Sequence, residues 1–530
     1  MTRLRIRNLR IVDGTGRPPF AGDILIRDGM LEAVGPLAGQ PDCETMDGAG
    51  LTAAPGFIDL HRHADLLAVR GEIGSAELPQ GITTAINGNC GMSAAPCPAG
   101  VQDRLYPYLR PVLGEAPSGC FPQYSEYAAR LRQTPLPLGV GGYIGCGTVR
   151  IAVKGFDPAP MTAGELATAR SMVIDAMAAG AVGLSLGLMY VPECHMPAPE
   201  LIALMEEAGR AGGLVSAHIR GEGASLPQSV QEVLSLARQA NVPLNISHLK
   251  AASRENWGQG LCRAIQSIEQ ARSAGQDVTA DAYPYDAGAT MLQTLLPPQF
   301  QGDALHILAQ PAQRDALKLL LAHPGDGWDN LALSLGWQTA VVSAVAHEEN
   351  MGCVGQSIAD IATQQQRDPV DCLCDILLRD DGRTAMVLHS MSAQDVRTVL
   401  RLPWTMVVSD AIYPPGGQPH PRVYGAFPRV LRWALDGLMP LEQAVRKMTA
   451  LPARRAGLAD RGQLRPGMRA DLVLFEEASV SDRATYEQPR QTPVGILWVF
   501  IGGQAAVAQG RLLHNTLGNY TERQVPTNGF

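Results

Sequence analysis

The chain has 530 residues, of which 46 % are hydrophobic and 18 % are charged, a composition typical of a globular protein with a large core. Its formal net charge is −8, and no run of Lys and Arg interrupts the acidic balance. Nucleic acid and anionic membranes are therefore excluded as main partners. The length allows more than one domain, and we expect an enzyme.

The start of the chain, "MTRLRIRNLRIVDGTG", alternates charged and apolar residues and lacks the apolar core of a signal peptide. No apolar stretch approaches the roughly 18 residues that a membrane span needs. The ten cysteines are scattered without the spacing of a disulfide framework. We therefore expect a cytoplasmic protein with reduced cysteines and no membrane partner, and its oligomeric state stays open.

Both ends of the chain have the pattern of short strands. Residues 1–55 alternate apolar and charged residues between Gly and Asp turns, and residues 460–530 repeat this pattern, most clearly from Val494 to Leu513. We expect these two ends to form one small β-sandwich domain.

The residues between them, 56–459, alternate short apolar runs with amphipathic stretches of helical spacing. The eight apolar runs are Gly56–His63, Thr83–Cys90, Pro137–Gly145, Ala181–Gly187, Leu214–His218, Pro243–His248, Asp277–Tyr283 and Trp404–Asp410. Eight strand-then-helix units over roughly 400 residues predict an α/β fold of the (β/α)8 TIM-barrel type. A doubly wound open sheet is the alternative. An insertion at about 286–350 interrupts the pattern and is a candidate lid or, equally, an oligomer contact. A further strand is expected in "TAMVLHS".

Residues that can bind a metal ion close five of the eight runs. They are His61 and His63 in the first run, Cys90 in the second, His218 in the fifth, His248 in the sixth and Asp410 in the eighth. In a TIM barrel these strand ends meet at one face, where catalytic groups lie. His61 and His63 are two residues apart on a strand and so point to the same side. Imidazole, thiolate and carboxylate together suit zinc.

Several motifs resemble those of one enzyme family. They are "GFIDLHRHAD", "GITTAINGNCG", "GLSLGLMYVP", "SAHIRGEG", "NISHLK", "DAYPYDAG", "SDAIYPP" and "HPRVYGAFPRVL". Over essentially its full length the chain resembles the amidohydrolase superfamily, and within it the N-acyl-D-amino-acid deacylases (D-aminoacylases). Many amidohydrolases bridge two metal ions with a carboxylated lysine from the fourth strand, which here reads "AVGLSLGL" and has no lysine.

The resemblance implies that Cys90 supplies the anionic ligand in place of that lysine. Gly88 and Gly91 beside it would let the backbone turn tightly. The family places one tight zinc ion on Cys90, His218 and His248, and a second, weaker position on His61, His63, Cys90 and Asp410. It also implies that Asp410 acts as general base and then general acid.

The resemblance further implies zinc-dependent hydrolysis of the amide bond of an N-acyl-D-amino acid, a small-molecule substrate. It assigns the substrate carboxylate to Lys250, Tyr283 and Arg422, and Tyr190 is expected to line the acyl or carbonyl pocket. The D configuration follows from the resemblance alone.

Three departures from the family pattern bear on substrate choice: Ala411 after the eighth strand, Cys146 after the third, and Arg62 with Ala64 in the first motif. None removes a ligand, but Ala411 and Cys146 are expected to reshape the pocket. The alternatives are a cyclic-amide hydrolase of the hydantoinase or dihydroorotase type, a deacylase of another small amide, and a metal-binding scaffold without catalysis.

Overall fold

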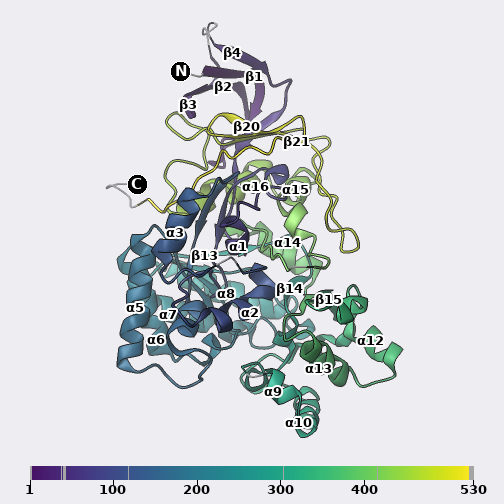
Figure 1. Ribbon diagram of the computed structural model, residues 1–530. Helices are drawn as coiled ribbons and strands as arrows, with labels where there is room; N and C mark the ends of the chain where they lie inside the picture. The colour runs from purple at the N-terminus through teal and green to yellow at the C-terminus, as the bar shows by residue number, and fades with distance from the viewer. Residues whose placement is uncertain are drawn as a thin grey trace.

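The computed structural model describes residues 3–37, 39, 43–116, 119–302, 304–414 and 416–524. Figure 1 shows three parts: a central α/β barrel, a sheet built from both chain ends above it, and an inserted segment at the lower right. None of the helices in the described ranges is long and apolar enough to cross a membrane.

Eight parallel strands form the barrel. They are β6 (Phe57–Asp59), β7 (Ile82–Asn87), β8 (Gly139–Gly142), β10 (Gly183–Gly187), β11 (Leu214–His218), β12 (Leu244–Ile246), β13 (Val278–Ala282) and β17 (Thr405–Val407). After β8 the chain continues into β9 (Ile144–Gly145), which pairs with β10. Just beyond β17, the Asp410 N–H donates to the carbonyl of His61 at 2.9 Å, which joins the eighth unit to the first. The predicted TIM-type barrel is thus confirmed, and the open-sheet alternative is wrong.

Helices cover the outside of the barrel because each presents one apolar face to the strands. The main ones are α4 (Cys146–Lys154), α5 (Ala163–Ala178), α6 (Ala198–Arg210), α7 (Leu226–Gln239), α8 (Gln259–Ser273), α14 (Ala393–Arg401), α15 (Arg422–Leu435) and α16 (Leu441–Met448). In α7, for example, Val230, Val233 and Ala237 are buried at helical spacing. These faces and the strands together form the largest hydrophobic core of the molecule.

The two chain ends meet in one nine-stranded sheet. Its strands are β1 (Arg3–Ile11), β2 (Phe20–Arg27), β3 (Met30–Gly35), β4 (Glu44–Asp47), β5 (Thr52–Pro55), β18 (Leu472–Phe475), β19 (Ile496–Ile501), β20 (Gln504–Ala508) and β21 (Arg511–Leu512). Antiparallel pairing of β5 with β18 joins the two ends, and a separate core includes Ile24 and Leu472. The last described residues leave this sheet, since the Thr521 N–H donates to Val140 of the barrel at 2.7 Å. Residues 525–530, part of the predicted domain, lie outside the described residues.

The inserted segment lies between β13 and β17 and has its own core. It contains a three-stranded antiparallel sheet of β14 (Gly288–Met291), β16 (Ala385–Leu388) and β15 (Ala340–Ala344), with helices that include α10 (Pro311–Leu321) and α13 (Pro369–Arg379). The expected strand in "TAMVLHS" is β16, the central strand of this sheet. The segment therefore runs on to Leu388, beyond the expected limit of 350, because β16 pairs here and not in the barrel.

Candidate metal centre

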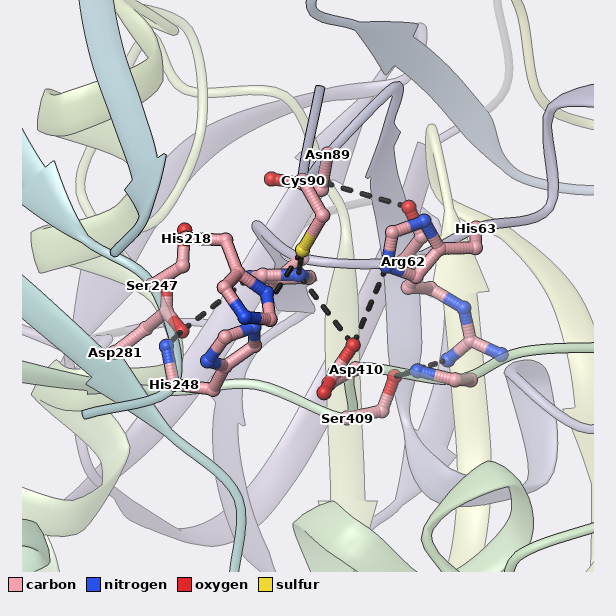
Figure 2. A network of polar contacts seen from close by, with 12 residues as sticks. Arg62, His63, Asn89, Cys90, His218, Ser247, His248, Asp281, Ser409 and Asp410 are labelled. Carbon is pink, nitrogen blue, oxygen red and sulfur yellow. Dashed lines mark hydrogen bonds and ion pairs between the residues drawn. The ribbon is translucent and has the colours of Figure 1, made fainter. Parts of the chain in front are cut away.

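The six predicted ligands converge at the mouth of the barrel, and Figure 2 labels all of them except His61. They are His61, His63, Cys90, His218, His248 and Asp410, and all are buried. The Sγ atom of Cys90 lies 3.2 Å from Nε2 of His61 and 3.4 Å from Nε2 of His248. The same Nε2 atom of His61 lies 3.4 Å from Oδ1 of Asp410. The structure thus brings together side chains from the ends of five strands.

The ligand atoms fall into three overlapping groups, each within 4.8 Å of one another. The groups are His61, His63 and Cys90; Cys90, His218 and His248; and His61, His248 and Asp410. Cys90 belongs to the first two groups. His61 and His248 likewise each belong to two groups, so the six residues form one continuous cluster of donors.

Three of the six residues have left-handed backbone conformations, with φ of 54° at Cys90, 34° at His248 and 49° at Asp410. Such conformations cost a residue with a side chain on the order of 1–3 kcal/mol and persist only where the surroundings enforce them. Each of these residues comes two or three positions after its strand, so the backbone turns sharply there and directs the side chain over the barrel mouth.

The turn that carries Cys90 depends on its two glycines. Gly88 and Gly91 both have φ of 73°, and a Cβ atom would lie 2.2 Å from the carbonyl oxygen of Tyr143 at the first and 2.1 Å from Glu193 at the second. The predicted tight turn is therefore present. Glycine is required at both positions because neighbouring protein atoms leave no room for a side chain.

Burial and charge prepare the donors for a cation. Burial lowers the pKa of His218 and of His248 well below the ordinary value, so both rings are neutral. Burial also lowers the pKa of His61, but the neighbouring Cys90, Asp281 and Asp410 raise it well above its ordinary value. Acidic groups around His61 therefore favour positive charge at this point, which a metal ion would supply in place of a proton.

The pKa values of Asp410 and Cys90 are shifted in opposite directions. Burial would raise the pKa of Asp410, but the Arg422 guanidinium, whose Nη1 lies 2.9 Å from Oδ2, and His61 hold it well below the ordinary range. Burial raises the pKa of Cys90 to about 11. A bound cation would lower the pKa of this thiol, because coordination stabilises the thiolate.

These residues fit a zinc ion. One thiolate with several imidazoles is a donor set that zinc prefers. Both ring nitrogens of His218 are buried, and within the described residues neither has a hydrogen-bond partner. Leaving buried polar atoms unpaired is costly, and coordination to a metal ion would remove that cost.

Two acidic residues at the site were missed by the sequence analysis. Oε1 of Glu222 lies 2.9 Å from Nδ1 of His248 and accepts from Lys250 at 2.6 Å. Nζ of Lys250 also lies 2.8 Å from Nδ1 of His248, so Glu222 and Lys250 both contact this nitrogen, while Nε2 of His248 faces Cys90. Asp281 accepts the His248 N–H at 2.6 Å, and its Oδ1 lies 3.4 Å from Nδ1 of His61. Glu222 follows His218 by four residues in "SAHIRGEG", which was the available signal.

The four predicted substrate-binding residues line the same cavity as the ligands. The Tyr283 ring lies between two cations, with Arg422 Cζ 4.5 Å and Lys250 Nζ 5.9 Å from its centroid. The Tyr190 ring lies 4.9 Å from that of His218, and its hydroxyl is 3.1 Å from Oγ1 of Thr290. Lys250 is paired with Glu222 at 2.6 Å and Arg422 with Asp410 at 2.9 Å, so the cavity contains two ion pairs beside the metal donors.

The three departures from the family pattern lie outside this cavity. Neither Cys146 nor Ala411 is among its lining residues, so they do not shape its surface directly. Arg62 points away from the metal donors, as its strand position predicts, and is fully buried. It donates to Asp59 at 2.9 Å and to Glu77 at 2.6 Å, and so ties the first strand to the segment that precedes the second.

Comparisons with known proteins agree with this geometry. The model of the amidohydrolase family matches residues 198–507. D-aminoacylase from Alcaligenes xylosoxydans xylosoxydans is 33 % identical over 516 residues, which cover 96 % of each chain. N-acyl-D-glutamate deacylase from the same organism is 34 % identical over 95 % of this chain and 93 % of its own.

A solved structure extends the likeness to three dimensions. The crystal structure of N-acyl-D-glutamate deacylase from Bordetella bronchiseptica, complexed with zinc and a phosphonate mimic of the tetrahedral intermediate, superposes with a TM-score of 0.81. It is 32 % identical and covers 98 % of this chain and 99 % of its own. The chain therefore belongs to the amidohydrolase family, within its N-acyl-D-amino-acid deacylase branch.

Proposed function

We propose that the protein hydrolyses the amide bond of N-acyl-D-amino acids to a carboxylate and a free D-amino acid. The observation that carries this proposal is a single cavity lined by five of the six metal donors and, beside them, by Lys250, Tyr283 and Arg422. A linear amide with a free carboxylate needs both features. The D configuration is supported by the similarity to D-aminoacylase and N-acyl-D-glutamate deacylase.

The proposed cofactor is zinc. Cys90, His218 and His248 would hold one ion tightly, and His61, His63, Cys90 and Asp410 would form a second, weaker site. Support comes from the donor set and from the zinc in the related glutamate deacylase. Bound zinc polarises an amide carbonyl and lowers the pKa of water towards neutrality.

Asp410 is the proposed general base and acid. Its Oδ1 faces His63 at 3.3 Å and the donor cluster, while Oδ2 is paired with Arg422. The carboxylate accepts a proton from the attacking water and passes it to the leaving amine. Its lowered pKa keeps the carboxylate ionised before the reaction.

Three side chains would hold the substrate's carboxylate next to the metal donors. Arg422 offers a guanidinium that can bind a carboxylate in a two-point manner, and Lys250 offers a point charge. Tyr283 lies between them, and its buried hydroxyl has no hydrogen-bond partner within the described part of the chain. Tyr190, next to His218, would line the carbonyl or acyl pocket.

The cytoplasm is the proposed location. All ten cysteines are free, which fits a reducing compartment.

The test is amine release by the zinc-loaded protein from matched N-acetyl-D- and N-acetyl-L-amino acids, with cyclic hydantoins on the same plate. We expect turnover of the D series alone, and its loss in the Asp410→Asn variant. Ring opening without turnover of any N-acyl amino acid would instead support the cyclic-amide alternative. Zinc binding without turnover of any amide would support the non-catalytic scaffold.

A further inference from the structure

A long loop of the chain-end sheet reaches the surroundings of the barrel mouth. It connects β18 with β19 over residues 476–495, and in Figure 1 the yellow chain descends from that sheet towards the inserted segment. Half-way along the loop lies Tyr486, whose side chain is half-buried. We propose that Tyr486 is a positioning residue that holds the substrate-binding Arg422 in place through His420. This inference rests on the proposed function and adds a residue to it.

Tyr486 contacts both stems of the inserted segment, which leaves the barrel at Asp286 and returns at His389. Its hydroxyl donates to Oδ1 of Asp286 at 2.9 Å, and its ring lies 4.8 Å from that of His389. The stems also bond to each other, because the N–H of Met391 donates to the carbonyl of Asp286 at 3.1 Å. One side chain of the loop is therefore anchored where the inserted segment begins and ends.

The third contact of Tyr486 is His420, which is 1 % exposed. The two rings are 5.2 Å apart and nearly perpendicular, at 83°. The Tyr285 ring lies at the same distance from the imidazole, at 88°. Edge-to-face packing of this kind is a favoured arrangement of aromatic rings. The orientation of His420 thus depends on the ring of Tyr486 as well as on its own hydrogen bonds.

Those hydrogen bonds connect His420 to Arg422. Nδ1 of His420 accepts the backbone N–H of Arg422 at 3.0 Å, and Nε2 donates to the carbonyl of Ala287 at 2.9 Å. Arg422 is the first residue of α15, where backbone N–H groups have no partner within the helix. Its Nη2 donates to the carbonyl of Ala289 at 3.2 Å. His420 therefore fixes the start of α15, and with it Arg422, against the first stem of the inserted segment.

The loop has other attachments on either side of Tyr486. Oδ2 of Asp482 lies 2.6 Å from Nη2 of Arg429 in α15, and Arg490 donates to the carbonyl of Gly417 at 2.6 Å. The loss of the Tyr486 side chain should therefore leave the loop in place. Variants at this position test the residue and not the attachment of the loop.

The described residues that line the cavity of the metal donors include Arg422 but neither Tyr486 nor His420. Neither side chain is thus placed to touch the substrate. Their influence on the reaction has to pass through Arg422, so substrate binding is the property that a variant should change.

The experiment measures KM and kcat of the zinc-loaded protein with the N-acetyl-D-amino acid that the wild type hydrolyses fastest. Tyr486→Leu removes the ring and the hydroxyl. We expect KM to rise about tenfold or more while kcat falls less, because a displaced Arg422 binds the substrate carboxylate less well. Tyr486→Phe keeps the ring next to His420, so its KM should lie between those of the wild type and Tyr486→Leu. Arg483→Gln, an exposed change on the same loop, is the control and should match the wild type.

His420→Gln tests the path from Tyr486 to Arg422. It should raise KM at least as much as Tyr486→Leu does. The double variant should have nearly the KM of His420→Gln alone, because two residues that act through one contact are not additive. Affinity for the first zinc ion, measured with a competing chelator, should stay unchanged in every variant, whereas a general disturbance of the barrel mouth would weaken it.

A wild-type KM in Tyr486→Leu would overturn the inference, and so would increases in KM that multiply in the double variant. A loss of zinc affinity parallel to the rise in KM would also overturn it, since Tyr486 would then support the whole mouth. If Tyr486→Leu does not fold, a wild-type KM in His420→Gln is the contradicting result. Absence of wild-type turnover on every N-acetyl-D-amino acid would instead overturn the proposed function, and the inference with it.

Discussion

The two ends of the barrel both bury charged side chains, but in different ways. At the mouth, Asp410 and Arg422 form an ion pair within a cluster of donors whose contacts leave room for a cation and a substrate. At the base, Lys447 donates to the backbone carbonyls of Leu402 and Thr405, where β17 begins, and no acidic residue is among its hydrogen-bond or ion-pair partners in the described chain. Charges at the mouth of a TIM barrel serve chemistry, and those at its base serve stability. Variants at the two ends test this division.

The largest effect is expected from Asp410→Asn. The amide cannot accept the proton of the attacking water, and general acid–base groups contribute about 10²- to 10⁴-fold to rate. We expect kcat to fall by roughly 10³-fold. The buried Arg422 loses its charged partner, so the melting temperature should fall as well, and calorimetry would check that the variant is folded at the assay temperature. Near-normal turnover would remove Asp410 from the mechanism.

Glu222→Gln should act through the metal ion. The variant keeps the shape of the side chain but loses the carboxylate charge that lies beside Nδ1 of His248 and Nζ of Lys250. Such supporting carboxylates contribute roughly 10- to 100-fold to metal affinity. Zinc affinity measured with a competing chelator should weaken by that amount. Glu232→Gln, which removes a carboxylate outside the cluster, is the matched control and should leave zinc affinity unchanged.

Lys250→Met should act on substrate binding. Loss of one of the two cations next to Tyr283 is expected to raise KM about tenfold or more, while kcat falls less. The reason is that Lys250 would bind the carboxylate equally well in the bound substrate and in the transition state. A fall in kcat with no change in KM would show that Lys250 acts on the reaction and not on the carboxylate.

The smallest effect is expected at the base. Burial lowers the pKa of Lys447 to about 7. The unfolded chain, with an ordinary lysine pKa of about 10.4, binds the extra proton between these values, so folding should gain stability as pH rises from 7 to 10. Below pH 7 both states are protonated and the pH dependence from this residue ends.

The methionine in the Lys447→Met variant has no titratable group. Comparing the variant with the wild type therefore isolates the contribution of Lys447 to the pH dependence of stability. The melting temperature of the wild type, relative to the variant, should rise by about a few degrees between pH 7 and 9. The kcat of the variant should match that of the wild type at each pH. A large loss of kcat would contradict the division between the two ends.

Much of the site could be predicted from the sequence because barrel strands end in recognisable apolar runs. His61, His63, Cys90, His218, His248 and Asp410 each follow such a run, and the structure brings all six together. Glu222 and Asp281 were not predicted as site residues. Glu222 lies in a loop, and Asp281 lies within an apolar run, where a single acidic residue carries no periodic signal. The ion pair between Arg422 and Asp410 joins residues from two elements and depends on the closed barrel.

The sequence predicted some parts of the fold better than others. The eight strands were found in order, but the inserted segment extends further than expected. The sequence of β16 is a short apolar run like those of the barrel, and periodicity cannot tell which sheet such a strand joins. The apolar residues that line the cavity were not predicted, since Met92, Leu331 and Met386 are far apart in the chain and come to line one cavity only in the folded protein.

The most direct test of the central claim is an anomalous difference map at the zinc edge from crystals of the zinc-loaded protein. The account predicts a strong peak bonded to Cys90, His218 and His248, with any second peak next to His61, His63 and Asp410. A map with no peak among these six residues, or with its strongest peak elsewhere in the molecule, would contradict it.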